Sequence, residues 1–288
     1  MIGSEKLALI EEIAPHLAKM SDATIDQAIE TGEILKDTKF HGKIDLPFAQ
    51  FYAPFDWINE NADIVLIGIT PGRRQAKAAL KTLRAALSAG KTPLEAAELA
   101  KQAASFDGEM RVIAKELMDR FQLQKVFRLG SCSDLFEQAR HRAHYTSLLR
   151  YPVLHWQTKR NKSGASKTGW FDFSGGDDVF TESLLVQSRE KDFEREIAHF
   201  KNAWLVPFGP TPAKALERLA AQGVLDRDRI LPGINHPSGT QRNRHNCQLN
   251  RTDDHSKCAA NVGCKDLRAR SIVLEAKVAA ILAQPSSQ

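Results

Sequence analysis

The apolar positions along much of the chain recur with the spacing of a helix. Between residues 5 and 35, hydrophobic side chains repeat with a period of about 3.6, which predicts an amphipathic helical region with a break at Pro15. The Thr-Pro-Leu-Glu run at 92–95 has the features of a helix start, with proline in the first turn. Further helices are predicted at residues 73–87, 93–104, 109–121, 189–201, 210–219 and 262–282.

Short apolar runs between these helices predict strands. The clearest run is Ile64–Ile67, which ends at Gly68 and has the length and composition of a buried parallel strand. Because strands alternate with helices, we expect an α/β fold, a three-layer α/β/α sandwich with a central, mostly parallel sheet. Further strands are predicted at 125–129, 144–149 and 204–208, and a last one that begins at 229.

The predicted elements divide the chain into two parts. We expect residues 1–60 to form a helical and aromatic N-terminal extension that packs on the core. Residues 61–288 are expected to form the α/β domain, with a helical insertion at about 75–120. The segments without a regular pattern are an irregular aromatic stretch at 40–60, a flexible loop at 157–178 and a polar loop at 236–261.

Composition narrows the class of protein. Of 288 residues, 42% are hydrophobic and 26% are charged, which is typical of a globular chain. No run approaches the ~18 apolar residues of a membrane span, so no membrane partner is expected. Four cysteines are too few for a disulfide scaffold. We expect a monomer in the reducing cytoplasm.

The net charge of +5 is unevenly distributed. Residues 1–60 hold five basic and eleven acidic residues, whereas residues 138–171 hold no acidic residue and residues 241–270 have a net charge of +4. Clustering of one sign is the footprint of phosphate binding, so DNA is the expected partner, although solvated basic loops give the same pattern. The basic residues of the first cluster are Arg140, Arg142, Arg150, Lys159, Arg160, Lys162 and Lys167.

Two turns at predicted strand ends combine proline and glycine with small polar side chains. In α/β sheets, ligands bind beyond the carboxyl ends of the strands. Glycine allows a ligand to approach the backbone, and histidine and serine can donate hydrogen bonds to an anionic ligand. The two turns are Gly68-Ile69-Thr70-Pro71-Gly72 and Asn235-His236-Pro237-Ser238-Gly239.

These turns resemble two motifs of the uracil-DNA glycosylase superfamily. Residues 68–72 match its first motif, G-x-[D/N/E]-P-[G/Y], and residues 236–239 match its second, H-P-S-[P/G]. Residues 145–150 resemble the family's strand that ends in Thr-Asn, and residues 205–209 resemble the strand that ends in glycine. The resemblance covers about residues 60–250 in the family's order, and it implies a fold like that of uracil-DNA glycosylase.

The resemblance implies an enzyme, a DNA glycosylase that flips a base out of DNA and hydrolyses its N-glycosidic bond. It places His236 as the electrostatic catalyst that stabilises the leaving base, and Thr70 at the water-activating position. It places Ser147 at the base-reading position and Ser238 on a DNA phosphate. Residues 240–244 correspond to the wedge that enters the minor groove.

Further contacts are assigned from their position beside these motifs. Ile69 and Phe55 are assigned to base binding, with core packing as the alternative for the Phe55 ring. Arg73 and Arg74 open the helix after the first motif, where a helix N-terminus already favours anions. The full set of expected DNA contacts is Arg73, Arg74, Ser238, Gln241, Arg242 and Arg244.

Two residues depart from the family's pattern. Thr70 stands where the family has an acid or an amide, and a threonine can orient water but is a poor general base. Ser147 stands where the family has asparagine, whose paired donor and acceptor read uracil. We therefore expect the base to be a modified or non-uracil pyrimidine, for example a phage-type modified cytosine, in either DNA repair or phage defence.

Other functions fit the same residues. The two substitutions also favour a non-catalytic nucleic-acid-binding protein with a degenerate glycosylase fold. A nucleotide-binding α/β enzyme of another kind ranks last, because the strand ends lack G-x-x-x-x-G-K-[ST] and G-x-G-x-x-G.

The cysteines raise the question of a metal. Some members of the superfamily carry an iron–sulfur cluster, but their close N-terminal cysteine pair is absent here. No cofactor is expected, and a zinc or iron–sulfur centre is the open alternative to free thiols and loop histidines. The candidate ligands are His245, Cys247, His255, Cys258 and Cys264.

Overall fold

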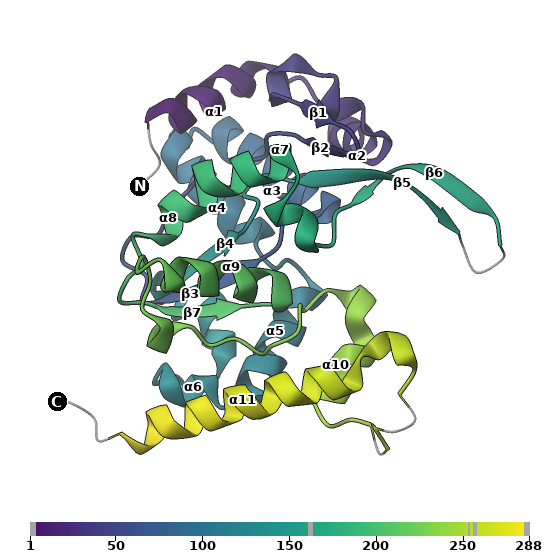
Figure 1. The fold of residues 1–288 in the computed structure, drawn as a ribbon. Helices are drawn as coiled ribbons and strands as arrows, with labels where there is room; N and C mark the ends of the chain where they lie inside the picture. The colour runs from purple at the N-terminus through teal and green to yellow at the C-terminus, as the bar shows by residue number, and fades with distance from the viewer. Residues whose placement is uncertain (1–3, 161–163, 253, 256–257, 285–288) are drawn as a thin grey trace. The chain divides into compact units, whose positions relative to one another are not determined.

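The computed structural model describes residues 4–160, 164–252, 254–255 and 258–284. The chain forms two compact units, and each consists of three separate stretches of sequence (Figure 1). The first unit consists of Met1–Ile58, Ile69–Ser105 and Tyr145–Ile197, and the second of Asn59–Gly68, Phe106–His144 and Ala198–Gln288.

Four helices of the first unit carry the apolar faces that the sequence predicts. Pro15 lies inside the first helix, which continues to Leu17, so the break predicted at Pro15 is wrong by a few residues. Ser21 caps the second helix, because its Oγ accepts a hydrogen bond from Thr24 N–H at 3.1 Å. The helices are α1 (Ser4–Leu17), α2 (Asp22–Thr31), α3 (Arg73–Ser88) and α4 (Pro93–Ala104).

Helices α3 and α4 form a hairpin with small residues on its inner side. Ala79 of α3 and Ala97 of α4 are fully buried, and alanines allow two helix backbones to pack closely. The predicted start of α4 is confirmed as a capping box. Thr92 N–H donates to Glu95 Oε2 at 2.9 Å, and Glu95 N–H donates to Thr92 Oγ1 at 3.3 Å.

The first unit also contains an antiparallel sheet in the order β1-β2-β5-β6, which the sequence did not predict. Two of its strands fall in the aromatic stretch that was expected to be irregular, and the other two form a ribbon where a flexible loop was expected. The ribbon was missed because both of its faces are largely polar, so no apolar alternation is visible. The strands are β1 (Lys43–Asp45), β2 (Phe48–Gln50), β5 (Val153–Arg160) and β6 (Ser166–Asp172).

A three-stranded sheet has the order β4-β3-β7. In the second unit β3 and β7 pair in parallel, with Val65 opposite Leu205. Every residue of β3 is buried, as expected for a parallel strand. The α/β class and these three strands are therefore confirmed, with bounds β3 (Ile64–Gly68), β4 (Ala143–Ser147) and β7 (Trp204–Pro207).

Two strand predictions in the second unit are wrong. The segment predicted as a strand at 125–129 overlaps a short helix. The buried Leu123 at the start of this helix and Phe127 at its C-cap lie four positions apart, which is the spacing of one helix face. The strand expected from 229 is reduced to one bridge between Leu205 and Ile230. The predicted polar loop contains a further short helix. The helices are α5 (Glu109–Arg120), α6 (Leu123–Val126), α9 (Pro210–Ala221), α10 (Arg242–Gln248) and α11 (Cys264–Ala283).

The helix predicted at 189–201 is divided. This region forms a π-helical turn over Arg189–Glu194 and then α8 (Arg195–Ile197), and α7 (Ser183–Ser188) directly precedes it. Within the described part of the chain, no helix is both long enough and apolar enough to cross a membrane.

Candidate functional site

The turn after β3 is fixed by hydrogen bonds to the chain just before β5. Ile69 O accepts a hydrogen bond from Leu149 N–H at 3.0 Å. The Thr70 hydroxyl donates to Tyr151 O at 3.0 Å and accepts from Val153 N–H at 3.2 Å. Thr70 therefore joins two backbone segments much as a pair of strand hydrogen bonds would.

These contacts limit the chemistry of Thr70. A threonine hydroxyl has one proton and two lone pairs, and here the proton and one lone pair are engaged. The remaining lone pair can accept a hydrogen bond from a water molecule. The role that this geometry supports is positioning of the turn, with no removal of a proton from water.

The three residues assigned to base binding differ in accessibility. Ile69 is 8% exposed, and Phe55 is 5% exposed within the core of the first unit. Phe55 therefore packs as the core alternative describes, and stacking on a base requires its ring to move. Ser147 is half-buried at the last position of β4.

Carboxylates of the first unit occupy the start of α3. Asp172 Oδ1, at the end of β6, accepts hydrogen bonds from Arg73 N–H at 3.2 Å and from Arg73 Nε at 3.0 Å. The Arg73 guanidinium also lies 3.3 Å from Glu30 Oε2. The helix N-terminus thus already has an anion of its own. Arg74, the other arginine of this turn, is exposed.

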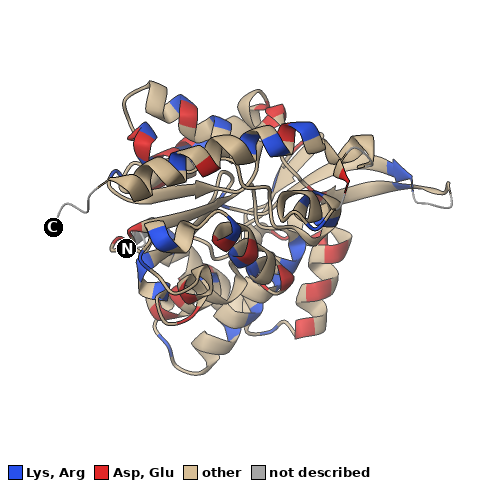
Figure 2. Ribbon diagram, turned by 90° about the horizontal axis from the view of Figure 1, so that it is seen from below, with Lys and Arg blue, Asp and Glu red and all other residues tan. Residues whose placement is uncertain are grey.

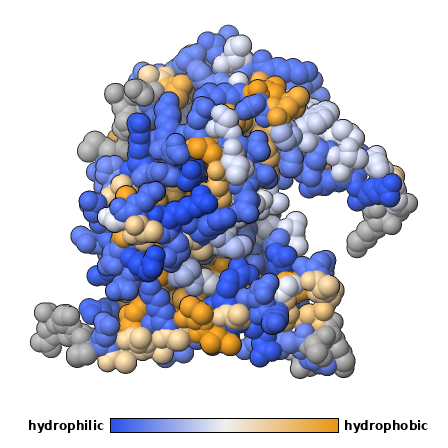
Figure 3. All heavy atoms as spheres, in the orientation of Figure 1, coloured by the Kyte–Doolittle hydropathy of each residue, from blue (hydrophilic) through white to orange (hydrophobic). Residues whose placement is uncertain are grey.

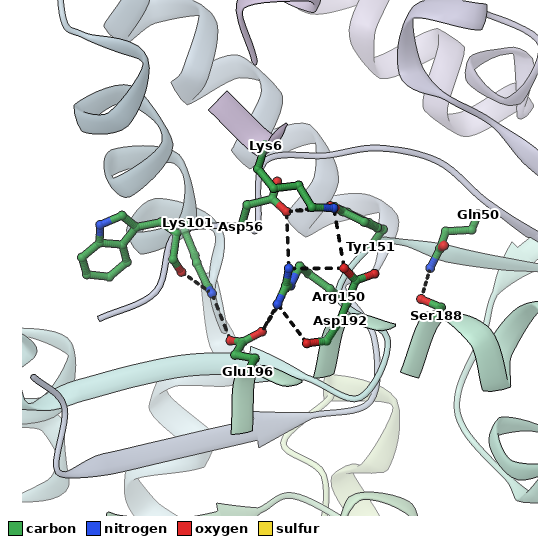
Figure 4. A network of polar contacts seen from close by, with 10 residues as sticks. Lys6, Gln50, Asp56, Lys101, Arg150, Tyr151, Ser188, Asp192 and Glu196 are labelled. Atoms are coloured by element: carbon green, nitrogen blue, oxygen red, sulfur yellow. Dashed lines mark hydrogen bonds and ion pairs between the residues drawn. The ribbon is translucent and has the colours of Figure 1, made fainter. Parts of the chain in front are cut away.

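Arg150, one residue of the predicted basic cluster, is buried and paired with acids (Figure 4). Its Nη2 lies 2.6 Å from Glu196 Oε2, and its Nη1 lies 3.4 Å from Asp192 Oδ1 and 3.7 Å from Asp56 Oδ1. Burial acts to lower the pKa of Arg150, but these carboxylates outweigh burial and raise it. Arg150 is therefore a structural cation, and its expected contribution to a DNA-binding cluster is wrong.

Two lysines and a tyrosine complete this network (Figure 4). Tyr151 Oη donates to Asp56 Oδ1 at 2.6 Å, and Lys6 contacts the same tyrosine oxygen. Lys101 Nζ donates to Trp57 O at 2.6 Å and lies 3.7 Å from Glu196 Oε1. Burial lowers the pKa of Lys101 to about 8, against the opposing effect of Glu196.

The accessible charge of the first basic cluster lies on the β5–β6 ribbon (Figure 2). Lys159, Arg160 and Lys167 are exposed, and no acidic residue lies among them. Trp156 is 44% exposed and packs edge-on against Trp170 across the ribbon, with ring centroids 5.2 Å apart. In Figure 3 the described part of the ribbon is coloured mostly blue to white, from hydrophilic to intermediate hydropathy. Lys162 lies outside the described residues.

The second motif forms a turn beside the end of β7. Gly209 follows β7 with φ +98°, a backbone conformation that favours glycine, and its N–H donates to Ile234 O at 2.8 Å. A Cβ at Gly209 would lie 3.7 Å from His236 Cβ. The strand end and the His236 turn therefore meet closely, in the order that the motifs predict.

The hydrogen bonds of His236 define its tautomer. Its Nδ1 lies 3.3 Å from the backbone N–H of Ser238, which donates to it. An Nδ1 that accepts a hydrogen bond has no proton, so the neutral ring carries its proton on Nε2. Burial and the neighbouring His245 lower the pKa of His236 to about 4. At neutral pH the ring is therefore neutral, with Nε2–H as a donor.

Two residues of α10 brace this turn, and sequence reasoning did not assign this role to either. His245 Nε2 lies 2.8 Å from His236 O, so His245 is engaged here and is not a member of the cysteine cluster. Gln248 Oε1 accepts from Asn235 N–H at 2.8 Å, and Gln248 Nε2 donates to Gly233 O at 2.7 Å. No local pattern marks Gln248, because it acts on backbone thirteen residues away.

The other residues assigned to DNA in this unit surround the turn. The Oγ atoms of Ser238 and Thr240 are 3.0 Å apart. Arg242 is exposed and lies 3.3 Å from Glu109 Oε1, and Arg244 Nη2 donates to Asn261 O at 3.0 Å. The predicted wedge forms a 3-10 turn, which includes Gln241, and the start of α10. The joint pocket of Thr70, Ser147 and His236 stays a prediction.

Four of the candidate metal ligands converge in the second unit. The ligand atoms of Cys247, His255, Cys258 and Cys264 all lie within 4.8 Å of one another. Cys247 and Cys264 are buried, and the other two are half-buried. The fourth cysteine, Cys132, is buried apart from this group.

The fold and the histidine turn define a mixed α/β protein with parallel strands, and a candidate site at the carboxyl end of β7. No family model matches the chain. The chain is 32% identical over 197 residues to the uncharacterized protein YoxB of Bacillus subtilis (strain 168), an alignment that covers 67% of this chain and 72% of YoxB. The chain therefore belongs to the YoxB family.

A solved structure was also found to be similar. The crystal structure of wild-type Pedobacter heparinus SMUG2 matches with a TM-score of 0.37 and 12% sequence identity, over 79% of this chain and 94% of that chain.

Proposed function

We propose that this protein is a DNA glycosylase that removes a modified or non-uracil pyrimidine from DNA. The observation that carries the proposal is the state of His236 within a motif that resembles a glycosylase motif. Its ring is neutral, its Nδ1 is occupied by Ser238 N–H, and its Nε2–H is the remaining donor. A fixed donor in a partly buried site can stabilise charge that develops on a leaving base.

The reaction that this donor supports is hydrolysis of the bond between C1′ of the sugar and the ring nitrogen of the base. The bonding electrons leave with the base, and the resulting negative charge on its oxygen is stabilised by His236 Nε2–H. Water adds to the cationic sugar carbon and releases a proton. Because the sugar is already strongly electrophilic, a Thr70 that positions the turn without acting as a base is compatible with this reaction.

The proposed specificity rests on Ser147. A serine hydroxyl offers one adaptable hydrogen bond in less volume than an asparagine amide, which offers a fixed donor and acceptor. A pocket with serine at this position favours a pyrimidine with a larger substituent over plain uracil. Phage-type modified cytosine is the example that we would test first, since it distinguishes a defence role from repair.

The proposed DNA contacts are phosphate contacts from exposed basic residues and from the second motif. Lys159, Arg160 and Lys167 of the ribbon add a charged surface that lies beside two tryptophans. Aromatic rings with interleaved cations are suited to a nucleic acid with unpaired bases. Further proposed phosphate contacts are Arg74 in the first unit and, in the second unit, Ser238 and the residues from Gln241 to Arg244.

The test is a base-release assay on DNA oligonucleotides that each carry one modified pyrimidine, with uracil included. We expect release of at least one modified base and a rate at least 10²-fold lower for His236→Ala, in line with the removal of one fixed donor. The matched control is His199→Ala, a histidine of the same unit that lies outside both motifs. Activity confined to uracil would contradict the proposed specificity.

The second candidate is a non-catalytic nucleic-acid-binding protein. The observation in its favour is that the Thr70 hydroxyl is engaged with backbone both as a donor, to Tyr151 O, and as an acceptor, from Val153 N–H. This candidate predicts DNA binding without base release on every substrate of the panel. It also predicts the same DNA affinity for His236→Ala and for the unaltered protein.

A further inference from the structure

The end of the second unit contains a cluster of one histidine and three cysteines that the proposed reaction does not use. His255 Nδ1 lies 3.6 Å from Cys247 Sγ and 3.3 Å from Cys264 Sγ. Cys258 completes the group, with all four ligand atoms within 4.8 Å of one another. We propose that Cys247, His255, Cys258 and Cys264 bind one structural zinc ion.

The distances from His255 to the two buried sulfurs are close to those of a tetrahedral zinc site. Zinc binds cysteine sulfur at about 2.3 Å and histidine nitrogen at about 2.0–2.1 Å, so neighbouring ligand atoms of a tetrahedron lie about 3.4–3.8 Å apart. The two distances from His255 Nδ1 to sulfur lie at or just below this range. Three thiolates and one imidazole form a closed ligand set of the kind found in structural zinc sites.

The surroundings favour thiolates. Cys264 is the first residue of the 20-residue helix α11, where the helix dipole stabilises negative charge. Val262 and Leu267 are buried against the cysteines and shield the group from water. In the reduced chain, in which Cys247 and Cys264 are thiols, binding of Zn²⁺ releases three thiol protons to solvent and leaves one net negative charge on the centre, next to this positive helix end.

In the structure the sulfurs of Cys247 and Cys264 are paired as a disulfide. A disulfide uses two of the four groups and gives no role to His255 and Cys258, although both point into the same small volume. A free Cys258 thiol beside a disulfide is also placed for thiol–disulfide exchange. Zinc uses all four groups, so the convergence of four ligands favours the metal over the bridge.

The segment between α10 and α11 has little apolar core of its own, and this favours a metal that stabilises it. In its described part it contains only short turns, and the buried apolar cluster at its two ends consists of Cys247 of α10, Val262, and Cys264 and Leu267 of α11. So few residues form too small a core to hold the segment, and a tetrahedral ion replaces core packing in such cases. The ion would tie the end of α10 to the start of α11.

The zinc site would also stabilise the His236 turn, a consequence that rests on the proposed function. Cys247 precedes Gln248, which bonds the backbone on the N-terminal side of His236 and also donates to Ser271 of α11 at 3.1 Å. His245, two residues before Cys247, contacts His236 O. Loss of the metal should therefore loosen the turn. We expect this loosening to be measurable as faster hydrogen exchange of the Asn235 amide.

The test is elemental analysis of the full chain, purified without a histidine tag in the presence of a thiol reductant. We expect one zinc per chain that survives dialysis and four thiols that become reactive after chelation and unfolding. In the cobalt-substituted protein we expect the visible absorption of tetrahedral Co²⁺ with thiolate ligands. These readouts do not depend on base release, so the zinc proposal and the glycosylase proposal can fail separately.

Variants with matched controls assign the ligands. Cys258→Ser and His255→Ala should lower the zinc content to less than a tenth, and His255→Cys should restore it, because cysteine is also a zinc ligand. Cys132→Ser and His199→Ala, which lie outside the cluster, should keep one zinc per chain. The proposal is overturned by a metal-free native chain with a Cys247–Cys264 bridge, by iron with inorganic sulfide, or by zinc that persists in Cys258→Ser and His255→Ala.

Discussion

At the scale of single residues, backbone groups determine what the candidate catalytic side chains can do. The Ser238 N–H donates a hydrogen bond to His236 Nδ1, and the Tyr151 carbonyl accepts one from the Thr70 hydroxyl. His236 therefore keeps one donor, whereas Thr70 keeps only a lone pair. The two motif residues of the proposed site are thus unequal: His236 is equipped for electrostatic stabilisation, and Thr70 for orientation.

The pH dependence of base release follows from the neutral state of His236. Burial and His245 lower the pKa of His236 to about 4, so the neutral ring is present above that pH. Protonation of His236 Nδ1 removes its hydrogen bond with Ser238 N–H, because the new Nδ1–H and the Ser238 N–H are then two donors that face each other. We expect kcat/KM to be nearly constant from pH 8 to pH 5 and to fall only as the pH approaches 4.

Nitrogen-15 NMR of the imidazole provides the direct measurement for this prediction. The neutral ring should show a protonated Nε2 and an unprotonated Nδ1 at pH 6. Because the pKa of His236 is lower in the folded state than its ordinary value of about 6.5, its contribution to stability is complete above pH 6.5 and is lost as the pH falls toward 4. A half-loss of activity near pH 6.5 that tracks His236 protonation would contradict this account.

The sequence pointed to the His236 turn, but not to the side chains that hold it in place. His236 was found because proline and glycine next to a histidine at a strand end form an unusual local pattern. Gln248 gave no signal, since its hydrogen bonds to Asn235 and Gly233 depend on how α10 folds back. Arg150 was assigned to a basic surface, because charge along the chain does not reveal which side chains are buried among acids.

At the scale of elements, the sequence predicts buried strands correctly and misses strands that are exposed to solvent. The strands β3 and β7 are buried apolar runs, and the sequence predicts both correctly. Residues 125–129 taken alone predict a strand. The helical spacing becomes visible only when the buried Leu123, four positions before Phe127, is included. The β5–β6 ribbon was missed because solvent contacts both of its faces.

The ribbon carries the most direct prediction about DNA binding. Each phosphate that a basic side chain neutralises adds about 0.9 to the slope of log K against log salt concentration for duplex DNA. We expect the triple variant Lys159→Ala, Arg160→Ala and Lys167→Ala to bind DNA more weakly at low salt, with a slope reduced by about 0.9 for each phosphate that is no longer neutralised. Fluorescence anisotropy with a labelled oligonucleotide at several salt concentrations measures both quantities.

The control for the ribbon is a triple variant with the same change of charge elsewhere. Lys19, Lys36 and Lys125 are exposed, and none lies in the two basic segments. Their replacement by alanine should leave the salt slope unchanged. An equal reduction in both triple variants would show that net charge, and not the ribbon, determines the affinity.

At the scale of the whole molecule, the first unit is assembled from three distant stretches of chain, and its buried ionic network joins all three. Lys6 and Asp56 come from the first stretch, Lys101 from the second, and Arg150 and Glu196 from the third. The sequence could not predict this network, since each member is an ordinary charged residue in its local context. Its ion pairs connect the first stretch to the third and the second stretch to the third.

Replacing Arg150 measures how strongly the network holds the unit. Arg150→Met leaves Asp56, Asp192 and Glu196 buried with fewer cations, and removal of one partner from a buried ionic group costs about 3–5 kcal/mol of unfolding free energy. Urea denaturation followed by circular dichroism at pH 7 provides the value. The control is Arg227→Met, whose pair with Glu217 is 64% and 41% exposed and should cost about 0–1 kcal/mol. Equal losses for the two variants would mean that the buried network does not hold the three stretches together.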